Sequence, residues 1–227
     1  METMISNLKV YDLDESVLAS GYPMLTEVTD RDATPHDFKR AISLAIRESS
    51  EGHDNFLSGI LVSFNVTCSI KMWTEFERYH FAQIVSSQST MHRLATMDIE
   101  KQCVSYVDKD ILDRIIELQK KYEVTHDTED RLKLLYSCPT GLCLTARVST
   151  NLRQLKTLYK QRYNHSLPEW RQFCKEMVDL IPLFGLIVAQ FRERELNGRD
   201  GLIVPLCREV SCALTGGNDG EERHNNN

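Results

Sequence analysis

Three short polar stretches carry residue types that bind anions, and each lies at the edge of an apolar pattern. Gly52-His53 precedes an alternating segment, Arg78-Tyr79-His80 follows it, and Asn151-Leu152-Arg153 ends a second alternating segment, with Arg162 downstream. Imidazole and guanidinium groups can hold a phosphate or a developing negative charge. Taken singly, each residue is more often a helix cap, a solvated cation or a core histidine. Nothing in the sequence matches a glycine-rich phosphate loop, a metalloprotease helix or a nucleophile elbow.

The composition is that of a globular chain with an acidic balance. Of 227 residues, 41% are hydrophobic and 26% charged, which rules out a wholly disordered chain and a disulfide-stapled miniprotein. The 33 acidic and 27 basic residues give a formal net charge of -6, so we expect no non-specific binding to nucleic acid or anionic membranes. Any anion site must therefore be a local basic pocket. The longest apolar run, Leu180 to Ala189, is about half the length that crosses a bilayer, and it predicts a buried helix segment.

The cysteines indicate reduced thiols in a cytoplasmic protein. The chain has seven, an odd number without a repeating framework, and it begins without a charged-then-apolar leader. Cys138-x4-Cys143 and Cys207-x4-Cys212 have loose spacing for zinc and no accompanying histidine pair. We therefore interpret them as structural cysteines.

Hydrophobic periodicity predicts an alternation of strands and helices. Residues 60–69 and 142–150 alternate apolar and polar side chains, and a short strand is expected at 7–13. Apolar residues at helical spacing predict helices over 34–48, 70–85, from about 108 to 116, 127–136, 152–159 and 166–180, and Pro182 should interrupt the last of these. His80 falls on the apolar stripe of the predicted helix 70–85. Residues 215–227 lack apolar side chains to pack, and the tail over 214–227 is expected to be disordered.

Taken in order, the polar stretches resemble the flavin-dependent thymidylate synthases over roughly residues 7–190. Gly52-His53 and the strand after it are similar to that family's histidine-plus-strand segment. Arg78-Tyr79-His80-x7-Gln88 occupies the place of its signature, which reads Arg-His-Arg, seven residues, then Ser. Pro139, twelve residues before Asn151-Leu152-Arg153, and then Arg162 resemble its C-terminal segment, and this match is the more specific.

The resemblance implies a fold, a reaction and a set of site residues. The fold would be α+β: a single domain over residues 1–213 with a small antiparallel or mixed sheet flanked by helices, assembled as a homotetramer with active sites between subunits. In that family FAD, reduced by NADPH, passes a one-carbon unit from methylenetetrahydrofolate to C5 of dUMP. Arg162 would contact the pyrimidine as the catalytic residue and stabilise the negative charge that develops on the ring. The cofactor-binding residues would be His53, Arg78, His80, Asn151 and Arg153.

The chain departs from the family pattern at positions that bear on the nucleotide. Tyr79 and His80 stand where the signature has histidine and arginine, and Gln88 stands at its serine. Thr90 stands where an arginine would grip the nucleotide, and Leu135 falls at another expected arginine. Because each lost charge-assisted hydrogen bond is worth about 1.5–3 kcal/mol, we expect a lower affinity for dUMP.

Neighbouring residues offer substitutes for the missing groups. A register shift of one would place Ser87 or Ser89 at the serine position, and Arg93 or Lys133 could reach the vacated phosphate site. The candidate substrate-binding residues are therefore Ser87, Gln88, Ser89, Arg93 and Arg162.

Three interpretations remain open from the sequence. The chain is an active flavoenzyme that methylates or similarly modifies a pyrimidine nucleotide, or a catalytically degenerate homologue that binds FAD or a nucleotide in a regulatory or assembly role. The third is a chance resemblance, in which the polar junctions are only caps and salt links. Bound flavin separates the third from the first two, and catalysis separates the first from the second.

Overall fold

The computed structural model describes residues 3–197, which divide into two compact units. The first unit comprises residues 3–11 and 60–176, and the second comprises residues 12–59 and 177–197. The single domain over residues 1–213 remains a prediction because its end lies outside the described residues. The predicted tail, 214–227, also lies outside them.

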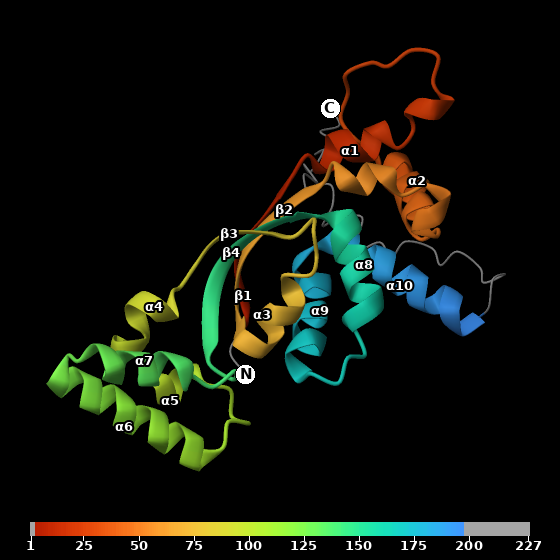
Figure 1. Ribbon diagram of the computed structural model, residues 1–227. Coiled ribbons are helices and arrows are strands. Elements are labelled where there is room, and N and C mark those ends of the chain that lie inside the picture. Colours follow the sequence, from red (N-terminus) through yellow and green to blue (C-terminus); the bar gives the residue numbers. More distant parts are fainter. Residues whose placement is uncertain (1–2, 198–227) are drawn as a thin grey trace, which may run out of the picture. The chain divides into compact units, whose positions relative to one another are not determined.

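A four-stranded antiparallel sheet forms the centre of the first unit (Figure 1). Its order is β1-β2-β4-β3, and the strands are β1 (Ile5–Tyr11), β2 (Leu61–Ser69), β3 (Gln83–Ser87) and β4 (Cys143–Asn151). The two central strands pair along their whole length, from Leu61 opposite Asn151 to Ser69 opposite Cys143. The prediction of an α+β fold with a small antiparallel sheet is confirmed.

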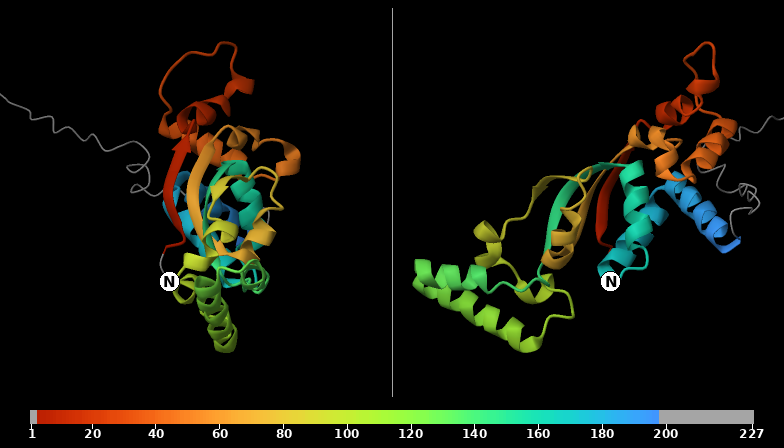
Figure 2. Two further views of the ribbon diagram at one scale, coloured as in Figure 1. Left: turned by 60° about the vertical axis from the view of Figure 1, so that its left-hand side comes forward. Right: turned by 45° about the vertical axis from the view of Figure 1, so that its right-hand side comes forward.

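One face of this sheet carries the core. Val62, Phe64, Val66 and Cys68 alternate along β2 and are all buried, as the period-two pattern predicted. Three helices pack on this face: α3 (Ile70–Phe76), α8 (Leu152–Arg162) and the first-unit part of α9 (Pro168–Leu180) (Figure 2). An aromatic cluster joins α3 and α9, with the rings of Phe76 and Trp170 stacked at 5.7 Å. This packing fixes the ends of β2 and β4, where the candidate site residues lie.

The predicted helix over 70–85 is wrong in its second half. The helix α3 ends at Phe76, and Gln83–Ser87 forms the edge strand β3, antiparallel to β4. Residues between them turn through backbone hydrogen bonds from Tyr79 to Phe76 and from Ala82 to Tyr79. Pairing with β4 satisfies backbone groups that a solvent-facing helix end would leave to water. His80 therefore lies exposed in a turn, not on an apolar helix face.

Four helices form a separate layer in the first unit: α4 (Thr90–Arg93), α5 (Ile99–Gln102), α6 (Lys109–Thr125) and α7 (Thr128–Tyr136). The side chain of Asp108 caps α6 and that of Asp127 caps α7, close to the helix starts that the sequence predicted. Their shared core consists of Leu94, Met97, Ile99, Ile115, Leu118, Leu134 and Leu142.

The second unit contains α1 (Leu13–Ala19), α2 (Pro35–Ala45), α10 (Pro182–Asn197) and the end of α9. Pro182 begins α10 and so interrupts the helical run, as predicted. Asp37 is buried between Arg31 and Arg40, and the hydrogen bonds from Arg31 hold the pKa of its carboxyl far below the usual range. Single 3-10 turns occur at Tyr22–Met24, Ser49–Glu51 and Asn55–Ser58 here, and at Leu94–Thr96 in the first unit.

Within residues 3–197 no helix is long and apolar enough to cross a membrane. The cysteines at positions 68, 103, 138 and 143 are free thiols, and the described part of the chain holds no group of three or more His, Cys, Asp or Glu placed to bind a metal.

Candidate functional site

Two of the predicted polar stretches meet at one end of the sheet. The hydroxyl of Thr150 donates to the main-chain oxygen of Phe81 at 2.8 Å, and Gln83 pairs with Ser149 across the β3–β4 ladder. The loop that carries Arg78 and His80 is thereby fixed beside the start of α8. Asn151 caps that helix, since its side-chain oxygen accepts from the main-chain N–H of Gln154 at 2.8 Å.

The side chains of this loop point in opposite directions. Tyr79 is buried, whereas Arg78 and His80 are exposed and form no side-chain hydrogen bond or ion pair within residues 3–197. On the neighbouring helix Arg153 is half-buried and has partners in the protein. The exposed guanidinium of Arg78 and the exposed imidazole of His80 are therefore available to a ligand.

Arg162 lies at the centre of a polar network beneath this loop. Its Nε donates to the Tyr79 hydroxyl at 2.8 Å, and its Nη1 donates to a carboxylate oxygen of Glu75 at 2.9 Å. The guanidinium carbon is 4.9 Å from the ring centre of Trp170, and Nη1 lies 2.9 Å from Nε2 of His165. Only 17% of the Arg162 side chain is exposed. Nη2 alone among its nitrogens makes no hydrogen bond within the described residues.

The carboxyl of Glu75 is held ionised by this network. Burial alone would raise the pKa of Glu75, but hydrogen bonds from Trp170 and Lys71, with the charges of Arg162 and His165, lower it overall. A fixed negative charge therefore faces the guanidinium and orients it.

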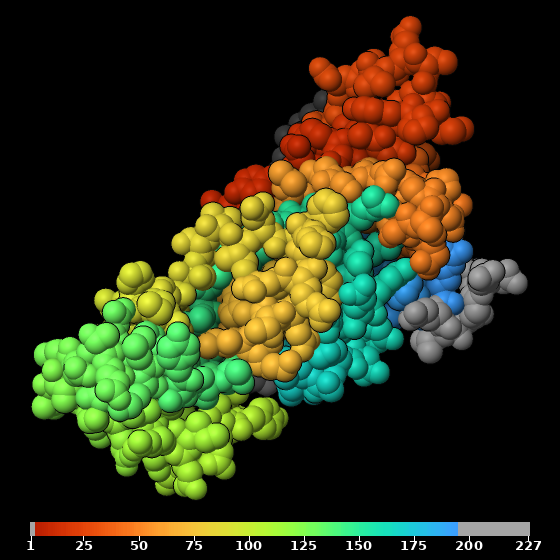
Figure 3. All heavy atoms as spheres, viewed as in Figure 1, coloured from red at the N-terminus to blue at the C-terminus, as the bar shows by residue number. Residues whose placement is uncertain are grey.

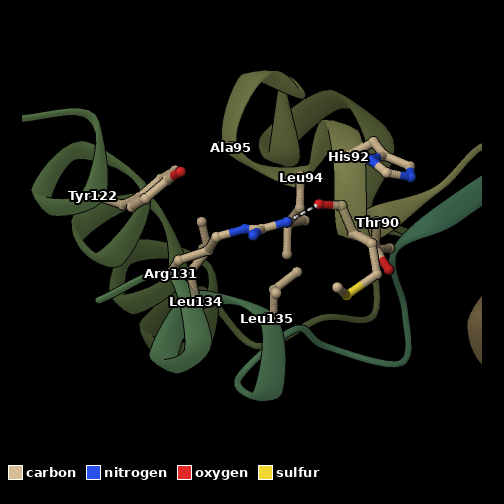
Figure 4. A pocket seen from close by; sticks show the side chains of 9 residues that line it. Thr90, His92, Leu94, Ala95, Tyr122, Arg131, Leu134 and Leu135 are labelled. Atoms are coloured by element: carbon tan, nitrogen blue, oxygen red, sulfur yellow. Dashed lines mark hydrogen bonds between the residues drawn. The ribbon is translucent and has the colours of Figure 1, made fainter. Parts of the chain in front are cut away.

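The positions of the two missing arginines line one cavity in the helical layer. Thr90 on α4 and Leu135 on α7 both face a cavity of about 150 Å³, and Arg131 lines it as well. Arg131 and Leu135 are four residues apart and so share a face of α7. Figure 4 shows Arg131 reaching from α7 toward Thr90, and its Nη2 donates to the main-chain oxygen of Met91 at 2.9 Å.

Sequence reasoning missed Arg131 and proposed two other cations. Neither Arg93 nor Lys133 lines this cavity, and Lys133 pairs with Glu129 at 2.7 Å. The signal that could have found Arg131 is its spacing, one helical turn before Leu135 on the same face.

The serine-rich segment continues the sheet edge. Ser87, the last residue of β3, is exposed and pairs with Ala146. Gln88 extends the ladder, because its N–H donates to Thr145 and its side-chain oxygen accepts from the N–H of Thr145, both at 2.9 Å. Ser89 begins α4 without a side-chain capping bond. The amide oxygen of Gln88 is therefore used by the protein.

His53 belongs to the second unit. Its Nε2 lies 3.8 Å from a carboxylate oxygen of Glu51, and nearly half of its side chain is exposed. That His53 binds a flavin stays a prediction.

Comparison with known proteins identifies the fold. No family model matches the sequence, and no curated protein matches it. Two solved structures of the flavin-dependent thymidylate synthase ThyX from Helicobacter pylori, both with FAD and dUMP, match with TM-scores of 0.61 and 0.62. They are 15% and 17% identical, cover 78% and 80% of this chain, and are themselves covered to 94%. The chain has the fold of the flavin-dependent thymidylate synthases, as the sequence resemblance predicted.

Proposed function

We propose that this chain binds FAD and a pyrimidine nucleotide and transfers a one-carbon unit to C5 of the pyrimidine, converting dUMP to dTMP or carrying out a close variant. The observation that carries this proposal is the cavity in which Thr90, Leu135 and Arg131 meet. Both positions that have lost an expected arginine face a guanidinium supplied from the same face of α7. A cation is thus retained at the place where the resemblance requires one.

Arg131 is suited to hold a phosphate. In the free protein it donates to a main-chain carbonyl of Met91, a neutral acceptor. A charge-assisted bond from guanidinium to phosphate is shorter and about twice as strong as a neutral one. We therefore expect a nucleotide phosphate to replace Met91 as the partner. One arginine in place of two also accounts for a weaker grip than the family pattern implies.

The loop of Arg78 and His80 fits a dinucleotide cofactor. Two exposed side chains that have no partner among residues 3–197 can donate to a pyrophosphate, and Asn151 and Arg153 lie at the adjacent helix start. When bound and reduced by NADPH, FAD would supply the reducing equivalents for the transfer from methylenetetrahydrofolate. The protein's own contribution is to hold the cofactor phosphates and to fix the loop through Tyr79 and Thr150.

Arg162 would act on the pyrimidine through Nη2. Its other nitrogens are held by Tyr79 and Glu75, so the orientation of the guanidinium is set before any ligand binds. A positive charge held beside a pyrimidine carbonyl stabilises electron density pushed toward C5.

We also propose a homotetramer with sites between subunits, which a mass four times that of the chain in light scattering would support.

A non-catalytic role is the second candidate. Arg162 is paired with Glu75, and the amide oxygen of Gln88 with Thr145, so both have protein partners where a substrate would need them. A protein that binds FAD or a nucleotide without turnover would retain these partners in every state.

The decisive experiment measures dUMP binding by calorimetry and dTMP formation with methylenetetrahydrofolate, NADPH and FAD. We expect Arg131→Ala to weaken dUMP binding by about tenfold or more, because it removes the phosphate's charged donor. Arg114→Ala is the matched control, because Arg114 is an exposed arginine of α6 paired with Glu117 and does not line the cavity. Equal dUMP affinity in wild type and Arg131→Ala would refute the phosphate site. Nucleotide binding without dTMP would favour the second candidate.

A further inference from the structure

Tyr79 turns inward from a loop that lies on the surface. The loop between α3 and β3 is visible on the outside of the chain in Figure 3, and Arg78 and His80 are exposed there. Tyr79 between them is only 9% exposed, and its ring contacts the rings of Phe76 and Trp170 edge-on. A buried tyrosine requires a partner for its hydroxyl. The last two residues of α8 supply that partner.

The hydroxyl of Tyr79 donates to one of these residues and accepts from the other. It donates to the side-chain oxygen of Gln161 at 2.9 Å and accepts from Nε of Arg162 at 2.8 Å. Because its single proton is given to Gln161, a lone pair of the hydroxyl oxygen faces the guanidinium. Gln161 therefore sets the direction in which Tyr79 accepts.

Three contacts fix the guanidinium of Arg162. Its Nε donates to Tyr79, its Nη1 donates to Glu75 at 2.9 Å, and its central carbon lies 4.9 Å from the ring centre of Trp170. With Nε and Nη1 both held, the plane of the group is defined and Nη2 points in one direction. With Nη1 held alone, the group could pivot about the contact with Glu75. The Tyr79 hydroxyl is therefore what prevents that pivot.

We propose that Tyr79 is a positioning residue for the one-carbon transfer and aims Nη2 of Arg162 at the pyrimidine carbonyl. This inference rests on the proposed function and gives a role to one departure from the family signature, the tyrosine at a histidine position. A hydroxyl accepts from Nε without carrying a charge, whereas an imidazole in the same place would gain a proton near neutral pH and repel the guanidinium. Tyrosine thus keeps the contact over a wider range of pH.

The titratable groups around this contact act on the other side of the guanidinium. Glu75 on α3 pairs with Nη1 of Arg162 through one oxygen and with Lys71 through the other, at 3.2 Å. His165, in the turn after α8, lies 2.9 Å from Nη1 of Arg162 and 3.6 Å from Glu75. A pH effect that arises at Nε can therefore be separated from one at Nη1 by substituting Tyr79 alone.

The test is the steady-state rate of dTMP formation with FAD, NADPH and methylenetetrahydrofolate at saturating concentrations. Tyr79→Phe keeps the buried ring without the hydroxyl. It should lower kcat about tenfold and change the KM for dUMP less than about twofold, because the lost contact serves the transition state. Tyr106→Phe is the matched control, because it removes a hydroxyl from a tyrosine that is 80% exposed.

The pH profile of a second substitution distinguishes positioning from a structural role. In Tyr79→His, kcat should fall more steeply than in wild type below about pH 6.5, as the imidazole gains its proton. Gln161→Ala removes the acceptor of the Tyr79 proton at an exposed position, so the fold is not at risk. It should lower kcat about threefold with an unchanged urea midpoint. In proton–nitrogen NMR, the Nε–H of Arg162 should exchange with water faster in Tyr79→Phe than in wild type.

The outcomes separate this inference from the proposed function. A wild-type kcat in Tyr79→Phe, or a raised KM with an unchanged kcat, would overturn the positioning role and leave the proposed function standing. If Tyr79→Phe does not fold, a wild-type kcat in Gln161→Ala overturns the role instead. A wild-type chain that binds dUMP but forms no dTMP would overturn this inference and favour the second candidate function. A chain that binds no dUMP would overturn both.

Discussion

Replacing Arg162 by methionine should lower the stability of the chain and abolish the proposed contact with a pyrimidine. The guanidinium donates to the Tyr79 hydroxyl at 2.8 Å and to the Glu75 carboxylate at 2.9 Å. A hydrogen bond to a charged group contributes about 1.5–3 kcal/mol. The contact of the guanidinium with the face of Trp170 adds about 0.5–1 kcal/mol. Methionine keeps an apolar stem against Trp170 but makes none of these polar contacts.

The net effect is smaller than the sum of these contacts. Part of the attraction offsets the desolvation of two ions. Glu75 also remains 17% exposed and can regain water once its partner is gone. We therefore expect Arg162→Met to lower the free energy of unfolding by about 2–4 kcal/mol, measured by urea denaturation with an unchanged m-value. A double-mutant cycle with Glu75→Gln should give a coupling of about 1–3 kcal/mol.

Arg162→Lys supplies the graded control. Lysine keeps the charge but is a compact donor that cannot reproduce the forked contact with Tyr79 and Glu75. The stability of Arg162→Lys should therefore fall between that of wild type and that of Arg162→Met. A loss below about 0.5 kcal/mol in Arg162→Met would show that the pair behaves like an exposed ion pair and would refute the reasoning. Folded Arg162→Met should bind FAD but not dUMP. Wild-type dUMP binding by this variant would remove Arg162 from the site.

Three further predictions follow from particular contacts. Because the pKa of Glu75 is lowered in the folded chain, its ionised carboxylate stabilises the fold above the unfolded carboxyl pKa of about 4.3, and this stabilisation is lost as the pH falls through the folded pKa. Urea midpoints should drop in that acidic range, and they should drop less in Glu75→Gln. Asp37→Asn leaves Arg31 and Arg40 facing a neutral amide, so it should cost about 3 kcal/mol; an unchanged thermal midpoint would contradict this. Thr90→Arg restores a second guanidinium to the cavity and should tighten dUMP binding about tenfold, and calorimetry that finds no gain would contradict the phosphate site.

The elements that the sequence predicted well are those whose signal is local. Alternation along residues 60–69 and 142–150 identified β2 and β4, because every second side chain of a half-buried strand enters the core. Asp108 and Asp127 marked helix starts because a cap acts within one turn. The edge strand β3 was predicted as helix, since Ile84 fits the apolar spacing of α3. Its strand state comes from pairing with β4, which no window around residue 84 contains.

The candidate site shows the same division. Asn151 was correctly interpreted as a helix cap. A shared role of Arg78 and Asn151 at one site stays a prediction, which the proximity of their two segments supports. Arg131 was missed because its relation to Thr90 depends on how α4 packs against α7. The relation of Arg162 to Glu75 was missed because that pair joins α8 to α3 across the core. Contacts between elements distant in sequence decide both roles.

Four of the five departures from the family signature, all except His80, fall into two physical groups. Tyr79 and Gln88 have become part of the scaffold, since the tyrosine hydroxyl bonds Gln161 and the glutamine oxygen bonds the backbone of Thr145. Thr90 and Leu135 instead border a cavity that still contains a guanidinium. Collapse of an unused site would be expected to fill such a space with apolar side chains, because a cavity costs stability. We therefore propose that recognition is altered at the phosphate end of the ligand, where Arg131 would replace two expected arginines.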